Sequence, residues 1–169
     1  MDNATTLSRH QPATRARPVV TSQHVFDTLN MLIETCADGA YGFASCADYS
    51  NISRHRTLFR QRAKDCDEAG AQLHVMLLRL GGQPAQKGSA AGMLPRGWVA
   101  VRGTLSGLRD RSILAECERG ESVAFERYQD ALKQNLPIEV RALVQRQCAF
   151  SESNLDQMRL MRDAKMAAN

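Results

Sequence analysis

The chain has 169 residues, of which 43% are hydrophobic and 5% are aromatic. This is the length of one ordinary domain, and the apolar content is enough to build its core. Ala, Leu, Met, Arg, Glu and Gln are abundant, which favours helices packed by aliphatic side chains over a sheet. We therefore expect an all-α protein with one folded domain, residues 21–166, after a flexible N-terminal tail, residues 1–20.

The charge of the chain is small and dispersed. Its 22 basic and 18 acidic side chains give a formal net charge of +4. A nucleic-acid groove needs clustered basic residues, so no nucleic-acid partner is expected. The sequence has no apolar run of about 18 residues for a membrane span and no apolar export segment at its N-terminus. We expect a cytoplasmic protein that makes no membrane contact.

The cysteines and histidines form no recognisable site. There are five cysteines and no CxxC pair, which argues against both a disulfide framework and a zinc knuckle. We expect reduced thiols, with Cys36, Cys66 and Cys117 facing the core and Cys46 and Cys148 accessible. The four histidines are scattered and are expected at the surface or its boundary. They are His10, His24, His55 and His74.

Four segments repeat apolar residues at steps of three and four, which is typical of amphipathic helices. Ser53 is a possible N-cap of the second helix, which Gly81 and Gly82 should end, and Pro137 suits the start of the fourth. The predicted helices span about residues 22–48, 53–80, 110–134 and 137–166. Core-facing residues are Phe26, Leu29, Ile33, Cys36, Ala40, Phe43 and Ala47 in the first, Phe59, Cys66, Ala69, Leu73, Met76 and Leu80 in the second, and Leu114, Cys117, Glu121, Ala124, Tyr128 and Ala131 in the third.

The connection between the second and third predicted helices is too long for a hairpin turn. It has nearly thirty residues, and its central part, about residues 89–105, could form a short helix that carries Trp98. Such a connection suggests a crossover along the bundle, as in ferritin-like topology. The expected fold is a ferritin-like up-down four-helix bundle: a helical hairpin, a crossover and a second hairpin.

Four stretches resemble a bacterial ferritin-like four-helix-bundle family of unknown function: LNMLIETCADGAYGF (29–43), LGGQPAQKGSAAGMLPRGW (80–98), ILAECERGES (113–122) and LP…VRALV (136–144). The likeness covers about residues 24–163, and the crossover string and ECERGE are its most specific parts. It implies the fold and a bacterial cytoplasmic setting but no activity. Family members often carry histidines where Pro95 and Leu155 stand here, which weakens any inherited role based on imidazole.

A ferritin-like di-metal site needs a Glu from each of two helices and a Glu-x-x-His pair from each of the other two. Glu34 to Glu68 and Glu118 to Glu152 are each 34 residues apart, which two antiparallel hairpins would bring level. No histidine follows three residues after Glu68 or Glu152, and at 100° per residue Glu34 and Glu68 point away from the core. We expect no metal and no other cofactor. The alternative is a di-iron or di-manganese centre, with Glu34, Glu118 and Glu152 as weak candidates.

Glu121 is the acidic residue that the helical spacing turns inward. A buried carboxyl group needs polar partners, and folding the last hairpin about residues 135–136 places Ser151 near it. Gln147 and Asn154 lie on the same face as Ser151, and Arg62 of the second helix is a further candidate. Three interpretations stay open: a network that fixes helix register, a ligand-binding pocket, and catalysis with Glu121 as general base.

Two functions follow as hypotheses. The first is a non-enzymatic bundle with a structural, stress-related or partner-binding role. The alternative is a metal-dependent ferritin-like oxidase or metal-storage protein that uses bundle carboxylates. A small-molecule binder that uses the polar core near Gln147 and Asn154 is a third possibility. A long helical pair offers a two-fold interface, so we expect a homodimer.

Overall fold

The structure is a computed structural model, and it describes residues 22–85 and 110–167. This part of the chain forms four α-helices and no strand, which confirms the all-α prediction. The helices are α1 (Ser22–Tyr49), α2 (Ser53–Arg79), α4 (Asp110–Lys133) and α5 (Ile138–Ala167). The predicted tail and the predicted crossover with its short helix lie outside the described residues. None of the described helices is long and apolar enough to cross a membrane.

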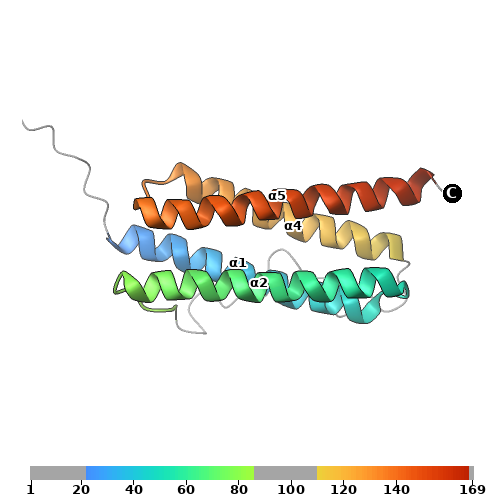
Figure 1. Cartoon of the computed structure of the whole chain (residues 1–169), viewed down its shortest axis with the longest axis horizontal. Coiled ribbons are helices and arrows are strands. Elements are labelled where there is room, and N and C mark those ends of the chain that lie inside the picture. The colour runs from blue at the N-terminus through green and yellow to red at the C-terminus, as the bar shows by residue number, and fades with distance from the viewer. Residues whose placement is uncertain (1–21, 86–109, 168–169) are drawn as a thin grey trace, which may run out of the picture.

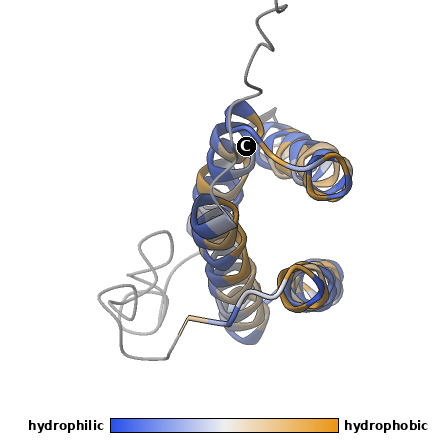
Figure 2. Cartoon of the chain, turned by 90° about the vertical axis from the view of Figure 1, so that its left-hand side faces the viewer, coloured by the Kyte–Doolittle hydropathy of each residue, from blue (hydrophilic) through white to orange (hydrophobic). Residues whose placement is uncertain are grey.

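The helices form two hairpins that lie against each other, α1 with α2 and α4 with α5 (Figure 1). Between the hairpins, α1 packs against α4, whereas α2 and α5 come close to each other at few positions. Seen along its axis, the bundle has the outline of a C with α2 and α5 at the two ends (Figure 2). The four-helix bundle is therefore open on one side.

The C-terminal end of α2 is as predicted. Gly81 has a φ of +80°, a conformation that glycine adopts without strain. The Gly82 N–H donates to the Leu77 carbonyl at 3.0 Å and the Gly81 N–H to the Leu78 carbonyl at 3.0 Å, which is the Schellman pattern. The two glycines thus satisfy carbonyls at the end of the helix and stop it.

The N-terminal end of α2 differs from the prediction. Ile52, not Ser53, occupies the N-cap position, and it makes no side-chain capping bond. The hydroxyl of Ser50 instead accepts a hydrogen bond from the Ile52 N–H at 3.4 Å. The turn between α1 and α2 is therefore stabilised by a residue that precedes the N-cap.

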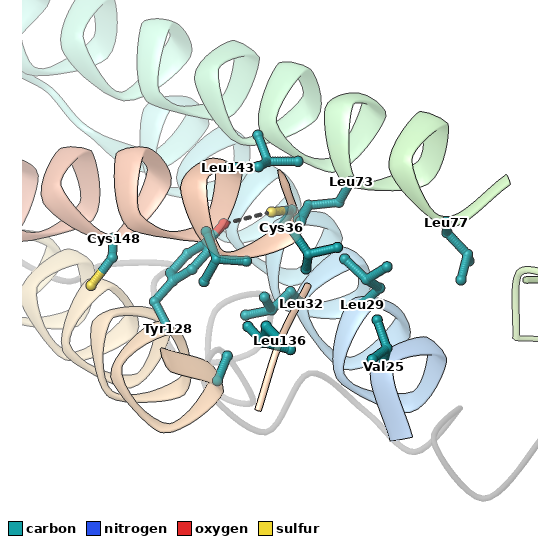
Figure 3. Packing of buried hydrophobic residues seen from close by; sticks show 13 residues of the cluster. Val25, Leu29, Leu32, Cys36, Leu73, Leu77, Tyr128, Leu136, Leu143 and Cys148 are labelled. Carbon is teal, nitrogen blue, oxygen red and sulfur yellow. Dashed lines mark hydrogen bonds between the residues drawn. The ribbon is translucent and has the colours of Figure 1, made fainter. Parts of the chain in front are cut away.

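The apolar core consists of two clusters that follow each other along the bundle. Cluster 1, at the end where α1 begins, contains Val25, Leu29, Leu32, Cys36, Leu73, Leu77, Tyr128, Ala131, Leu136, Val140, Leu143, Val144 and Cys148 (Figure 3). Cluster 2, toward the other end, contains Phe43, Cys46, Ala47, Phe59, Ile113, Leu114, Cys117 and Met158. Every helix contributes to both clusters, so each end of the bundle is tied together by its own apolar contacts.

The buried face of α1 is wider than the predicted one. Val25 and Leu32 are buried, whereas Phe26 and Ile33, which the spacing placed in the core, are half-buried. The reason is that α1 packs against both α2 and α4, so its buried face lies between the two contacts. Leu80, also predicted in the core, is 36% exposed because it lies beyond the last turn of α2.

Three side chains that we expected to be accessible are buried. The exposed fractions are 0% for Cys46, 8% for Cys148 and 4% for His55. Cys46 belongs to cluster 2 and Cys148 to cluster 1, and the His55 ring lies beside Phe59 with the ring centroids 5.9 Å apart. These predictions were wrong because each residue faces a second neighbour that one helical face does not reveal.

Helices α1 and α2 approach closely through two contacts between a glycine and a cysteine. A Cβ atom at Gly39 would lie 2.9 Å from the Cys66 sulfur, and one at Gly70 would lie 3.2 Å from the Cys36 Cβ. Each helix therefore lacks a side chain where the other presents a thiol. Cys36 and Cys66 lie in the same layer of the bundle, as the folded hairpin predicts.

Alanine at Gly39 should destabilise the fold. Its methyl group must displace the Cys66 sulfur, and overpacking of this kind costs about 1–3 kcal/mol, more than the roughly 1 kcal/mol that alanine adds to helix propensity. Urea unfolding followed by circular dichroism measures the loss. In a Cys66→Ala background the same substitution meets no sulfur and should be neutral or stabilising. Equal losses in the two backgrounds would show that this contact does not control the packing.

Candidate functional site

A cavity of about 360 Å³ lies at the level where cluster 1 gives way to cluster 2. All four described helices line it, and its lining includes residues of both α2 and α5, the two helices that come close to each other at few positions. We call it the α2–α5 cleft. Its volume falls within the range of small-molecule sites, roughly 300–1,000 Å³. Its lining includes Cys36, Gly39, Phe43, Cys66, Ala69, Glu121, Ala124, Tyr128, Gln147, Phe150, Ser151 and Asn154.

The buried carboxyl group in the lining of the cleft is that of Glu121, which is 5% exposed. The Ser151 hydroxyl donates a hydrogen bond to its Oε1 at 2.6 Å, and the Asn154 side-chain amide donates a second. Asn154 is itself 4% exposed, and its Oδ1 has no hydrogen-bond partner within residues 22–85 and 110–167. The predicted neighbours Glu121, Ser151 and Asn154 thus meet in one cluster that contains an unsatisfied acceptor.

Burial raises the pKa of Glu121 to about 7. The hydrogen bond from Ser151, the positive charge of Arg62 and the hydrogen bond from Asn154 each lower the pKa, and the negative charge of Asp65 raises it. Desolvation outweighs the stabilising contacts because the carboxylate has lost most of its water. Near neutral pH the protonated and charged forms therefore coexist.

Tyr128 is the centre of a second hydrogen-bonded chain. Its hydroxyl lies 3.2 Å from the Cys36 sulfur (Figure 3). The same hydroxyl donates to Gln147 Oε1 at 3.0 Å. The Gln147 side-chain amide in turn donates to the Ala69 carbonyl at 3.1 Å and to Gln72 Oε1 at 3.2 Å. Gln147 therefore joins α5 to α2 at one end of the cleft and does not bond Glu121.

Arg62 joins α2 to α5 at another point. Its guanidinium donates to Gln157 of α5 at 2.5 Å and to Asp65 at 3.1 Å, and it lies 5.3 Å from the centre of the Phe150 ring. Its influence on Glu121 is that of a nearby charge. The structure therefore brings three of the five predicted residues into contact and places Gln147 and Arg62 as braces between α2 and α5.

The thiols and the phenol around the cleft are weak acids. Burial raises the pKa of Cys36 to about 11 and raises that of Cys66 and Tyr128 further above their usual values. Only the thiolate of a cysteine is a good nucleophile. These groups stay protonated near neutral pH and are poorly suited to nucleophilic catalysis.

The weak metal candidates do not converge. Glu118 accepts two hydrogen bonds from Arg162, at 2.7 and 2.5 Å, and lies 3.6 Å from Arg159. Glu152 is exposed and Glu34 is half-buried on a different helix. In the part of the chain that the structure describes, no three His, Cys, Asp or Glu side chains are grouped to hold a metal ion. The expectation that the protein binds no cofactor stays a prediction.

The sequence offered a ligand-binding pocket near Gln147 and Asn154 as one interpretation, but it gave neither the size of the cleft nor the chain from Cys36 through Tyr128 to Gln147. A signal was present, because Tyr128 lies on the predicted core face of its helix and its hydroxyl needs a polar partner once buried. What the pattern could not supply is the unequal spacing of the helices.

The family model described as Domain of unknown function (DUF2383) matches residues 24–134. The chain belongs to this family. No curated protein matches it. The matched region covers α1 from residue 24, α2 and α4, so it includes Glu121. Ser151 and Asn154 belong to α5 and lie beyond the match. Membership in the DUF2383 family brings no activity with it, and the ferritin-like relationship and bacterial origin stay predictions.

The raised pKa of Glu121 makes stability depend on pH. Between about pH 4.5 and 7 the folded state holds a proton that the unfolded state has lost, so the free energy of unfolding falls as pH rises through this window. The loss amounts to roughly 3 kcal/mol and is complete above the folded pKa.

Glu121→Gln should remove this dependence. Urea unfolding at pH 4.5 and pH 8 measures the free energy of unfolding of wild type and of the variant. The wild type should lose stability between these two pH values, and the variant should not. Glu68→Gln, which alters an exposed carboxyl, is the control and should follow wild type. A wild-type curve that parallels Glu121→Gln would mean that Glu121 titrates in its ordinary range.

Proposed function

We propose that the protein is a non-enzymatic ligand-binding bundle whose α2–α5 cleft takes up a small, largely apolar molecule with one polar end. The observation that carries the proposal is the cavity of about 360 Å³, whose lining includes the buried Glu121 carboxyl and the neighbouring Asn154 with its unpartnered Oδ1. This arrangement develops the third of the sequence hypotheses, a small-molecule binder that uses the polar core near Gln147 and Asn154.

The walls of the cleft supply the apolar contact that such a ligand needs. Ala69, Val123, Ala124, Phe43 and Phe150 all line it. Burial of apolar surface contributes about 25 cal/mol per Å², and small-molecule sites commonly combine such walls with a few polar groups that fix orientation. Here the polar groups gather at one end, which favours a ligand of one orientation.

The chemistry of the cleft favours binding over catalysis. The thiol of Cys36 and the phenol of Tyr128 stay protonated, and the Glu121 carboxyl already accepts hydrogen bonds from Ser151 and Asn154. The thiol and the phenol are therefore poor nucleophiles. The Glu121 carboxyl keeps acceptor capacity, which we assign to binding a ligand donor, and catalysis with Glu121 as general base stays the open alternative from the sequence. The structural or stress-related roles, the homodimer and the cytoplasmic location expected from the sequence stay predictions.

Filling the cleft should abolish uptake of an apolar probe. N-phenyl-1-naphthylamine is a neutral dye that fluoresces more strongly in apolar surroundings, and wild type should bind it saturably. Ala124→Leu adds bulk to the wall and should weaken binding at least tenfold, about 1.4 kcal/mol. Ala142→Leu, at an exposed α5 position outside the cleft, is the matched control and should bind as wild type. No saturable signal, or equal weakening by both variants, would refute the proposal.

The metal-dependent alternative makes a different prediction. Protein purified without chelator and loaded with iron or manganese would carry a pair of ions that is lost on Glu121→Ala, because a ferritin-like centre needs inward carboxylates. We expect no such pair after desalting, since Glu118 is held by two arginines and Glu152 faces solvent. Elemental analysis counts the ions, and a stoichiometric pair would favour the oxidase or storage function.

A further inference from the structure

We propose that the ligand of the α2–α5 cleft is an organic cation, a protonated amine on a small apolar body, whose ammonium group is held between the Glu121 carboxylate and Asn154 Oδ1. This inference rests on the function proposed above and adds the chemical class of the ligand. It starts from the hydrogen-bonding capacity of the buried polar cluster around Glu121.

The polar atoms left at this point are acceptors. Ser151 uses its hydroxyl proton on Glu121 Oε1, and Asn154 directs its amide N–H to the same carboxyl group. What remains is the unused capacity of the carboxylate and the buried, unpartnered Oδ1 of Asn154. A group that satisfies both must donate at least two hydrogen bonds, and an ammonium group has three donors and no acceptor.

The charges around the cleft also favour a cation. Asp38 lies 3.8 Å from Arg127, and Asp65 lies 3.1 Å from Arg62, so these acids are paired. Arg127 makes a further bond to Thr35 Oγ1 at 2.9 Å. The remaining charged groups of the lining are two exposed side chains of opposite sign, Glu68 and Arg146, and the buried Glu121. The buried charged group of the cleft is therefore the Glu121 carboxylate. A cationic ligand would neutralise its negative charge.

Aromatic rings supply the rest of the recognition. Phe43, Tyr128 and Phe150 line the cleft, and ring faces attract cations as well as apolar groups. One face of Phe150 already receives the Arg62 guanidinium, 5.3 Å from its ring centre, so Phe43 and Tyr128 are the rings left to contact a ligand cation. A cavity of about 360 Å³ is near the lower limit for small-molecule sites and suits a monoamine better than a long polyamine.

Binding of an ammonium group should be coupled to loss of the Glu121 proton. The cation favours the carboxylate, so below the free-protein pKa of about 7 the ligand must displace a proton. The ionisable or charged groups that surround Glu121 are Cys36 from α1, Arg62, Asp65 and Cys66 from α2, and Cys117 and Tyr128 from α4, and those from α5 are the neutral donors Ser151 and Asn154. The thiols and the phenol have pKa values raised by burial and stay neutral, so Glu121 is the group that links binding to pH.

Isothermal titration of the full chain with three probes of one skeleton tests the inference. The probes are 2-phenylethylamine, 2-phenylethanol and 3-phenylpropanoate, at pH 8. The amine should bind at least tenfold more tightly than the alcohol, and the carboxylate should not bind measurably. Affinity for the amine should fall about tenfold per pH unit below pH 7, with proton release detected by repeating the titration in buffers of different ionisation enthalpy.

Variants assign the effect to its residues. Glu121→Gln should lower amine affinity at least tenfold, leave alcohol affinity unchanged and remove the pH dependence. Glu126→Gln, at an exposed α4 position outside the cleft, is the control and should change amine affinity by no more than about twofold, as expected for an exposed charge. Asn154→Leu removes the unpartnered acceptor while Glu121 stays, and it should weaken amine binding several-fold even if Glu121→Gln fails to fold.

The outcomes separate the two proposals. Equal affinity for amine and alcohol, or equal effects of Glu121→Gln and Glu126→Gln, would overturn the cation inference and leave the apolar dye bound in the cleft. Failure of the dye and of all three probes to bind would overturn the ligand-binding function itself. Tighter binding of the carboxylate than of the amine would reverse the assigned charge of the ligand.

Discussion

The close contact between α1 and α2 decides where this bundle is open. Gly39 faces the Cys66 sulfur and Gly70 faces Cys36, so the two helices approach to a distance that larger side chains would prevent. The separation of packed helices follows the size of the side chains between them. Because α1 also packs on α4, and α5 follows α4, drawing α2 toward α1 leaves it distant from α5 (Figure 2). The cleft is the result of this unequal spacing.

At the same level the core changes from apolar to polar. A bundle selected for stability alone would fill this layer with aliphatic side chains, since replacing buried charged groups by well-packed apolar ones is often neutral or stabilising. This chain instead buries Glu121 with Ser151 and Asn154 and leaves one acceptor without a partner. An incompletely satisfied polar cluster beside a cavity destabilises a purely structural protein. A ligand that donates a hydrogen bond to the free acceptor would remove this destabilisation.

Much of the fold could be predicted from the sequence, because four helices follow from apolar spacing and the end of α2 follows from Gly81. The contact of Glu121 with Ser151 also follows from folding one hairpin about its turn. The burial of Cys46 and His55 could not be predicted, because it depends on which second helix or turn each face meets. A ligand-binding pocket was one of the open interpretations, but the size and position of the cleft could not be predicted, because the distance between helices depends on the packing of all of them and not on the apolar spacing of one.

The division of the core into two clusters has a mechanical consequence. Cluster 1 and cluster 2 each draw on all four described helices, while the layer between them depends on hydrogen bonds and on braces such as Arg62 and Gln147. Local opening takes place where apolar contacts are fewest, and here that is the middle of the molecule. We expect α2 and α5 to separate at midlength while the apolar clusters at both ends stay packed. A ligand could then enter and leave the cleft without unfolding the bundle.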